Sequence, residues 1–314
     1  MPKQILIDSD VALGDWVAIL YLLREPEADV RAITVAATGE AHARPGVHTA
    51  LRLLALADHP HIPVCAGPSR PLKGNKAFPF KIRLMVDLRG MLKMPLPRGS
   101  ESPRDAVSQI IHTLEQSADP VILVAIGPLT NVGLALQKRP DLKNKLAEVI
   151  IMGGAVDVPG NIMDVDPNIQ NRYAEWNIFC DPHSANLVFA SGAPVTLVPL
   201  EATNDVPFSR QFLQRLAEHN HHPWTDFLIR ALQKVAERLQ NEAGRVFYFW
   251  DALAAVLALH PELGLYETHR VRVVEEDGPE WGRVVRSENG YVIKICTGAD
   301  RAAFEQIFME GLNR

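Results

Sequence analysis

The sequence predicts an α/β fold, a single domain built on a mostly parallel, doubly wound sheet flanked by helices, with extra short strands near the C-terminus. Short β-branched runs alternate with helix-like segments through most of the chain. Most of these runs are almost continuously apolar, as strands are when helices cover both faces of a parallel sheet. In such sheets, ligands bind at the carboxyl ends of the strands.

The parallel part of the sheet is expected to hold six strands, over residues 4–7, 30–35, 62–65, 121–126, 148–151 and 194–200. Helices are expected between them, for example over residues 15–24, which stop before Pro26, and over residues 45–56. The C-terminal part returns to strand patterns in the segments RVRVVEE, GRVVRS and YVIKI. The pair Asn289-Gly290 between the last two predicts a hairpin.

Two stretches interrupt this alternation. Residues 70–104 are rich in proline and carry Phe78, Phe80 and scattered Lys and Arg, whereas residues 155–174 carry turn formers with little periodicity. Loops of this length are usually functional or disordered. A lid formed by residues 70–104 is therefore a hypothesis, which proteolysis with and without ligand would test.

The composition limits the class of protein. With 314 residues, 47% of them apolar, the chain can bury a large core, and we expect one domain over residues 1–314. The formal charge is 32 minus 37, or −5, and no run of Lys and Arg is longer than a pair. Nothing in this pattern attracts nucleic acid or anionic lipid, so a small or neutral partner is expected.

The cysteines and the N-terminus indicate the compartment. Three widely separated cysteines do not suit a disulfide framework and favour a reducing environment (Cys65, Cys180 and Cys296). The N-terminus enters a strand pattern at once, without a signal sequence, and no apolar stretch is long enough to span a bilayer. We therefore expect a cytoplasmic protein with no membrane partner.

Three carboxylates converge after the first strand, in the segment ILIDSDVALGDW. Asp8 and Asp10 share one side of an extended chain, and Asp15 opens the following helix. Like charges this close raise one another's pKa, so such a cluster needs a cation or a shared proton. Because the ligands are all oxygen, without His or Cys, they favour a hard ion, calcium or magnesium.

Two other interpretations of this segment stay open. Asp15 on its own is explained by helix capping, since a carboxylate suits the positive end of the helix dipole. The string hydrophobic-D-x-D also resembles the haloacid dehalogenase phosphatases, in which the first Asp is a phosphorylated nucleophile beside magnesium. That family needs an acidic pair after a later strand, and the sequence offers Thr38 and Thr130 but no such pair.

Further segments along the chain make one resemblance specific. They are AITVAATGEAH (32–42), VAIGPLTN (124–131), EVIIMGGAVDVPGN (148–161), AEWNIFCDP (174–182) and FWDALAAVLALHPEL (249–263). With the first motif, they resemble the calcium-dependent nucleoside hydrolase family, whose motifs are DxDxxxDD, GPLTN, MGG, GN, an E-x-N triplet and a late HD or WD pair. The resemblance covers most of the chain.

The resemblance implies a Ca2+ site. It makes Asp10, Asp15 and Asp251 metal ligands, together with the backbone carbonyl of Ile126. Asp8 is then a supporting carboxylate behind them. Calcium takes six to eight oxygens from carboxylates, carbonyls and water, so this donor set suits it.

The resemblance also implies residues that bind a nucleoside. Glu175, Asn177 and Asn161 match positions that grip the sugar hydroxyls, and amides and carboxylates suit a polyol. The other substrate-binding positions that it indicates are Met152, Glu40 and Trp250. Without the resemblance, Asn161 is a turn residue after Gly160, Glu175 is a surface charge and Trp250 is core.

Aromatic and histidine side chains are the candidates for handling the leaving base. The family has either His or Trp before the late Asp, so Trp250 indicates an aromatic face that stacks on a nucleobase. Trp176, Phe78 and Phe80 are further aromatic candidates. His42 and His48 are candidate acids from the loop after the second strand, although each is also typical of a surface position.

The activity that the resemblance implies is hydrolysis of the N-glycosidic bond of nucleosides to ribose and free base, as in purine and pyrimidine salvage. Asp10 would assist the attack of a metal-bound water, and nearby carboxylates would stabilise the oxocarbenium-like sugar. Family analogy also implies a homodimer or homotetramer.

One position departs from the family motif. DxDxxxDD ends in two Asp residues, whereas this chain has Gly14 before Asp15. In the family, the missing carboxylate accepts a sugar hydroxyl, a contact worth about 1.5 to 3 kcal/mol. A slower nucleosidase, a changed sugar, or a weakly catalytic nucleoside- or sugar-binding protein would follow, and in the last case Gly14→Asp should restore turnover. Two alternatives stay open. Glu40 or a water molecule takes the place of the missing carboxylate, or Gly14 only allows a tight strand-to-helix turn.

Overall fold

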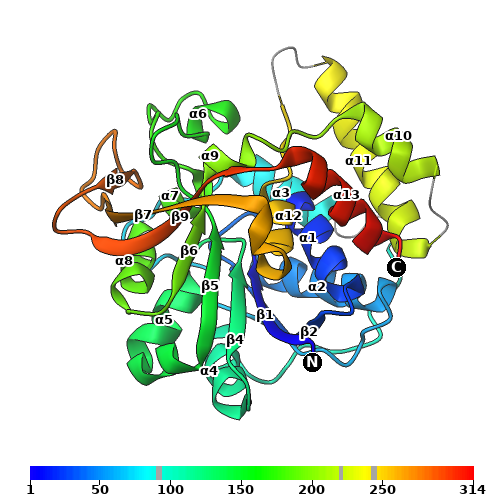
Figure 1. Ribbon diagram of the computed structural model, residues 1–314, viewed down its shortest axis with the longest axis horizontal. Helices are drawn as coiled ribbons and strands as arrows, with labels where there is room; N and C mark the ends of the chain where they lie inside the picture. Colours follow the sequence, from blue (N-terminus) through cyan, green and yellow to red (C-terminus); the bar gives the residue numbers. More distant parts are fainter. Residues whose placement is uncertain (90–93, 219–221, 242–245) are drawn as a thin grey trace.

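The computed structural model describes residues 1–89, 94–218, 222–241 and 246–314 (Figure 1). Its strands are β1 (Lys3–Ser9), β2 (Ala28–Val35), β3 (Val64–Ala66), β4 (Val121–Ala125), β5 (Leu146–Met152), β6 (Val195–Val198), β7 (Gly264–Val273), β8 (Val284–Arg286) and β9 (Tyr291–Ala299). Its α-helices are α1 (Leu13–Arg24), α2 (Ala43–Leu56), α3 (Phe80–Arg89), α4 (Ala106–Gln116), α5 (Thr130–Lys138), α6 (Ile162–Val165), α7 (Trp176–Cys180), α8 (Pro182–Ala190), α9 (Leu200–Thr203), α10 (Arg210–Glu218), α11 (Pro223–Asn241), α12 (Trp250–Leu259) and α13 (Arg301–Leu312). Two short 3-10 helices cover Pro140–Lys145 and Pro261–Leu263.

The strands form one sheet, in the order β3-β2-β1-β4-β5-β6-β9-β7-β8. β1 to β6 run parallel, and the direction in which the chain adds strands reverses between β1 and β4. In doubly wound sheets, ligands bind in the crevice at such a reversal, outside the carboxyl ends of the strands. The predicted fold class is confirmed, and the reversal lies at the end of the strand that carries Asp8.

Helices cover both faces of the parallel strands. Ile5 and Ile7 pack in one core cluster with α1, α2 and α12, whereas Leu6 packs in a second cluster with α4, α5 and α8. Figure 1 shows these two groups of helices on opposite sides of the central strands. Because both faces are buried, every β1 position from Ile5 onward is inaccessible, which explains the continuous apolar runs in the sequence.

The three C-terminal strands correct one prediction. β8 and β9 do not form a hairpin with each other, because β7 lies between them and pairs antiparallel with both. The connection crosses β7, and a Cβ on Gly290 would lie 2.6 Å from the backbone of Val271. Glycine is required there by this close crossing of two backbones, so the Asn-Gly signal marks a crossover instead of a hairpin.

The segment 70–104 contains a helix that the sequence did not predict, and its residues 90–93 lie outside the described part. α3 presents Phe80, Leu84 and Leu88 to solvent, with exposed fractions of 69%, 43% and 54%. Its inward positions carry Arg83 and Asp87 as well as the buried Val86. Apolar side chains therefore lie on both faces of the helix, which is why periodicity did not reveal it. The lid role stays a prediction.

The cysteines and the helix lengths agree with the expectations from composition. All three cysteines are free and buried, as expected for small core residues (Cys65, Cys180 and Cys296). Among the helices that the structure describes, none has both the length and the apolar character needed to cross a membrane.

Candidate active site

Four aspartates gather where β1 ends and where α1 and α12 begin, and none is more than 8% exposed. They are Asp8 in β1, Asp10 directly after it, Asp15 in the first turn of α1 and Asp251 in the first turn of α12. The two helices pack side by side. Since both begin at this point, the positive ends of their dipoles face the carboxylates.

Asp10 is enclosed by the turns that follow β2 and β4. The Glu40 N–H donates to Asp10 Oδ2 at 2.8 Å. A Cβ on Gly39 would lie 2.1 Å from the same oxygen, and a Cβ on Gly127 would lie 2.7 Å from the Asp10 backbone nitrogen. Glycine at both positions therefore lets the backbone approach Asp10 closely, which brings the Ile126-Gly127 peptide next to it.

Asp15 caps its own helix. Its Oδ1 accepts from Ser9 Oγ at 2.5 Å, and its Oδ2 accepts from the Ala12 N–H at 3.0 Å. Asp15 therefore does stabilise the start of α1, as the capping interpretation expects, but capping is not its only contact. Capping also fixes the carboxylate beside those of Asp10 and Asp251, whose charges raise its pKa. Asp15 thus belongs both to the helix start and to the cluster.

The residue between these aspartates adopts an unusual backbone conformation. Val11 has a φ of 57°, in the left-handed region that β-branched residues rarely occupy. Its N–H donates to Ser9 Oγ at 2.9 Å, and its carbonyl accepts from Trp16 Nε1 at 2.7 Å. These two buried hydrogen bonds hold the turn that carries the chain from Asp10 into α1.

Asp8 lies one layer behind Asp10. Its Oδ1 accepts from Thr34 Oγ1 at 2.6 Å and from Asn131 Nδ2 at 2.7 Å. Its Oδ2 and Asn131 Oδ1 are buried, and no described residue donates a hydrogen bond to either oxygen. A buried acceptor without a donor costs free energy, so this side of the site is short of positive charge.

The electrostatics of the four carboxylates agree with that shortage. Burial raises the pKa of Asp8 to about 7 and that of Asp10 to about 6. At Asp10 the charge of Arg83 acts in the opposite direction and lowers the pKa. Burial first, and then the charge of Asp10, hold the pKa values of Asp15 and Asp251 well above their usual range. Among the described residues, no group of three or more Asp, Glu, His or Cys side chains has an arrangement that could hold a metal ion as it stands.

Gly14 lies against Asp251. A Cβ added at Gly14 would be only 2.2 Å from Asp251 Oδ2, so this carboxylate occupies the space where a side chain at position 14 would begin. Glu40, which is partly buried in the turn after β2, is among the charges that raise the pKa of Asp251. Two acidic side chains therefore lie near the position where the family motif has its additional Asp.

Glu175 is buried at the start of α7, so its interpretation as a surface charge is wrong. It is 3% exposed and caps the helix, accepting from the N–H groups of Asn177 (2.9 Å) and Ile178 (3.2 Å). It also accepts from the Gly154 N–H at 2.9 Å. Burial raises its pKa to about 7, and the charge of Asp10 adds to the rise.

The other residues predicted to bind the sugar lie around Glu175, at the end of β5. Asn177 Nδ2 donates to the Met152 carbonyl at 3.1 Å, and Asn161 Oδ1 accepts from the Trp176 N–H at 3.2 Å. The chain segments after β5 thus form a polar wall that faces the aspartates. The structure therefore brings the two predicted groups of residues to the same edge of the sheet.

The aromatic candidates divide into two groups. Trp250 is partly buried against Phe247, with ring centroids 5.0 Å apart, and its Nε1 has no hydrogen-bond partner among residues 1–89, 94–218, 222–241 and 246–314. Trp176 and Phe78 stack on each other at 4.5 Å in a small core cluster, and both are buried. Phe80, by contrast, is 69% exposed on α3.

Several residues near the cluster were missed by the sequence analysis. Thr34 and Asn131 hold Asp8, and Asn131 ends the quoted GPLTN segment, which was the one available signal. Arg83 and Asp87 of α3 contact the turn after β2, and Asp87 pairs with the candidate acid His42. No signal marked these two, because their segment lacks a recognisable helical pattern.

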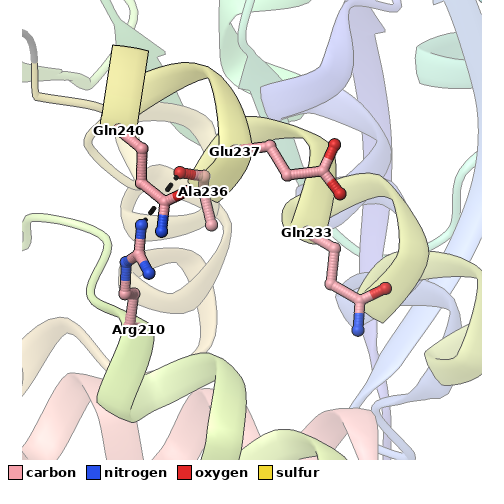
Figure 2. A pocket seen from close by; sticks show the side chains of 5 residues that line it. All are labelled: Arg210, Gln233, Ala236, Glu237 and Gln240. Atoms are coloured by element: carbon pink, nitrogen blue, oxygen red, sulfur yellow. Dashed lines mark hydrogen bonds between the residues drawn. The ribbon is translucent and has the colours of Figure 1, made fainter. Parts of the chain in front are cut away.

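A surface hollow between α10 and α11 contains none of the predicted site residues (Figure 2). It is lined by Arg210, Gln233, Ala236, Glu237 and Gln240. Arg210 Nη2 donates to the Ala236 carbonyl at 3.4 Å, which ties α10 to α11. The hollow is thus the space beside the contact between these two peripheral helices.

Comparison with known proteins identifies the family of the chain. The sequence pattern of the family described as inosine-uridine preferring nucleoside hydrolase matches residues 5–306. A probable uridine nucleosidase 1 of Oryza sativa is 28% identical over 271 residues, 86% of this chain and 81% of that one. The pyrimidine-specific ribonucleoside hydrolase RihA of Escherichia fergusonii is 36% identical over 204 residues, which cover 65% and 62% of the two chains.

Solved structures give the same result over the full chain. A plant nucleoside hydrolase, the PpNRh1 enzyme, superposes with a TM-score of 0.89 at 27% identity, covering 100% of this chain and 99% of that one. A purine-preferring ribonucleoside hydrolase from Gardnerella vaginalis gives 0.82 at 26% identity, covering 99% and 98%. The phosphatase interpretation is therefore wrong. The chain belongs to the inosine-uridine preferring nucleoside hydrolase family and is an N-glycosyl hydrolase.

Proposed function

We propose that this protein is a calcium-dependent nucleosidase in which Asp10 is the general base. The observation that carries the proposal is the buried group of four aspartates at the strand reversal, in which one oxygen of Asp8 accepts from no described residue. Its relatives are named for uridine, pyrimidine and purine substrates, so the proposed substrate class is nucleosides in general.

The residues present fit a hard divalent cation. The donors are carboxylate and carbonyl oxygens, burial raises the pKa values of all four carboxylates, and the dipoles of two helices add only partial positive charge. Asp10, Asp15, Asp251 and the Ile126 carbonyl would hold the ion, with Asp8 behind them. When bound, calcium supplies positive charge that makes water more acidic and binds sugar hydroxyls.

Asp10 is suited to accept a proton from the attacking water. It directly follows β1 at the crevice, and the Glu40 N–H fixes one of its oxygens. Burial raises its pKa to about 6, close to the neutral pH at which a base works best. The neighbouring carboxylates would stabilise the positive charge that develops on the sugar as the glycosidic bond breaks.

The polar wall after β5 is suited to orient the sugar. Glu175 is held rigidly by three backbone N–H groups, and the Met152 carbonyl holds the Asn177 amide. Rigid acceptors and donors cost little to order when a polyol binds. Asn161 and Trp250 complete the proposed substrate contacts, with Trp250 toward the base.

Glu40 is proposed to supply the carboxylate that Gly14 lacks. Its backbone touches Asp10, and its charge reaches Asp251, which occupies the space beside Gly14. A longer side chain from a different loop holds a sugar hydroxyl less rigidly than Asp at position 14 would. We therefore expect a lower kcat on ribonucleosides than a protein with Asp at this position would have. Separately, by analogy with the family, we propose a homodimer or homotetramer.

A reducing-sugar assay over common nucleosides, before and after removal of calcium with a chelator, tests the proposal. Sugar release that disappears with the chelator and returns on adding calcium is expected. Release that is unaffected by the chelator would overturn the calcium requirement. Calcium and nucleoside binding by calorimetry, with no release at high enzyme concentration, would overturn the proposed turnover.

A further inference from the structure

α3 is fastened to the turn after β2 by two residues on its inner face. Arg83 Nη2 donates to the carbonyls of Ala37 (2.8 Å) and Ala41 (3.1 Å). Asp87, one helical turn later, accepts from the His42 N–H at 3.0 Å and lies 2.6 Å from His42 Nδ1. The two side chains are four residues apart, so they project from one face of α3 onto residues 37–42.

The same turn holds Asp10 at two points. The Glu40 N–H donates to the Asp10 carboxylate at 2.8 Å, and the Ala41 N–H donates to the Asp10 carbonyl at 3.1 Å. Ala41 therefore bonds Arg83 through its carbonyl and Asp10 through its N–H. Only one residue separates the side chain of α3 from the backbone of the proposed base.

The burial of Arg83 requires an explanation. The residue is 9% exposed, and its buried Nε has no hydrogen-bond partner within the part of the chain that the structure describes. A buried guanidinium with an unsatisfied donor is costly, and an apolar side chain would fill the same space at lower cost. What an apolar side chain lacks is a donor for the two carbonyls of the turn.

We propose that Arg83 is a positioning residue for the hydrolytic reaction, which sets the place of the Asp10 carboxylate through the turn 37–42. The proposal rests on the role of Asp10 proposed above. Asp87 and His42 fix the same turn at its far end, so α3 and the turn act as one unit. A shift of the reacting groups by about 1 Å costs on the order of 100-fold in rate.

The test compares Arg83→Met, Arg83→Lys and Arg83→Gln with the matched control Lys81→Met, which removes an exposed cation from the same helix. Arg83→Met is expected to lower kcat about 10- to 100-fold, with KM changed by less than about threefold. Arg83→Lys should recover much of kcat, because an ammonium also donates to carbonyls. Lys81→Met should leave both constants unchanged.

Hydrogen exchange by mass spectrometry supplies a readout that does not depend on turnover. Peptides covering residues 36–42 should exchange faster in Arg83→Met than in the parent or in Lys81→Met, while peptides of the β5 core should not change. Equal exchange in all proteins would overturn the proposal, as would a kcat of Arg83→Met within twofold of the parent. Arg83→Gln, which keeps a shorter donor, should give a kcat between those of Arg83→Met and Arg83→Lys. If Arg83→Met does not fold, Arg83→Leu, which also lacks a donor, is measured in its place against the same two criteria.

Asp10→Asn separates this inference from the proposed function. Retained turnover in Asp10→Asn would overturn the role of Asp10, and the positioning role with it. Lost turnover in Asp10→Asn together with normal turnover in Arg83→Met would overturn the positioning role alone. Loss in both, with recovery in Arg83→Lys, is the expected result.

Discussion

Asp181 and the aspartates at the end of β1 are all buried but differ in their hydrogen-bond donors. Asp181 has no exposed surface, and it accepts from Leu72 N (3.0 Å), Thr130 Oγ1 (2.7 Å), and the N–H (3.1 Å) and Oγ (2.7 Å) of Ser184. Asp10 accepts from the Glu40 N–H, and one oxygen of Asp8 has no donor in the described part of the chain.

The difference shows that burial alone does not mark a functional carboxylate. A carboxylate that receives several donors is stable as an anion and can serve as a structural hub, which is how Asp181 joins three segments. A cluster whose donors are too few keeps a demand for positive charge. This need for positive charge distinguishes the aspartates at the end of β1 from Asp181. Substitutions in the two places should therefore have different effects.

The largest effect is expected from Asp10→Asn. Asn keeps the shape and can still accept from the Glu40 N–H, but it cannot take a proton from water. Turnover should fall by about 100- to 10,000-fold, the usual contribution of a general base. Single-turnover sugar release measures this, with the melting temperature as a control for folding. A loss below about tenfold would place the base elsewhere.

The second prediction concerns pH and calcium. The pKa of Asp8 rises from its ordinary value near 3.8 to about 7 on folding, and burial is the main cause. A carboxyl whose pKa is higher in the folded protein stabilises it fully below about pH 4, and this contribution is lost as the pH rises through about 7. For Asp8 the loss is about 4 kcal/mol, from about 1.4 kcal/mol per pKa unit.

The measurement is chemical unfolding between about pH 4 and 8, in a chelator and in calcium. Stability in the chelator should fall over this range, and the fall should be shallower in Asp8→Asn. Calcium requires ionised carboxylates, so its stabilising effect should grow as the pH rises. Stability in the chelator that rises with pH, or calcium stabilisation that is greatest in acid, would contradict the prediction.

Asp181→Ala should affect stability and leave chemistry almost intact. It removes the common acceptor of Thr130, Ser184 and Leu72, so buried donors lose their partner and α8 loses its cap. A loss of about 2 to 4 kcal/mol in unfolding free energy is expected, measured by denaturant titration. The kcat of the folded protein should stay within about threefold. A large loss of kcat at unchanged stability would make Asp181 functional instead.

The smallest effect is expected at Gly14. Because Asp251 Oδ2 occupies the space of a Cβ at this position, Gly14→Ala and Gly14→Asp both force that carboxylate to move. Each should lower kcat by about 3- to 30-fold, the equivalent of roughly 0.6 to 2 kcal/mol. Restoration of turnover by Gly14→Asp is therefore no longer expected. If Gly14→Asp raised kcat while Gly14→Ala lowered it, the missing charge, and not the space, would limit the reaction.

Sequence patterns predicted the parts of the molecule that depend on local composition. The apolar runs gave the six parallel strands, and the spacing of Asp8, Asp10 and Asp15 gave the cluster, because neighbours in sequence are neighbours at a strand end. Contacts between distant segments were accessible only by resemblance, as for Asp251, or not at all, as for Arg83.

The wrong predictions have physical causes of the same kind. The Asn289-Gly290 turn has hairpin chemistry, but β7 pairs with both flanking strands and forces the chain to cross it. Glu175 is not among the usual helix-capping residues, so its burial at the start of α7 carried no local signal. α3 was missed because apolar side chains lie on both its exposed and its buried face.

The left-handed Val11 makes the DxDxxxGD segment dependent on the rest of the fold. A conformation that a β-branched residue avoids costs about 1 to 3 kcal/mol, and here Ser9 and Trp16 compensate through buried hydrogen bonds. The motif therefore adopts this conformation only when the residues around it supply these hydrogen bonds. Grafted onto another strand-to-helix junction without an acceptor at position 9 and an indole at position 16, the same residues would relax, and the aspartates would no longer converge.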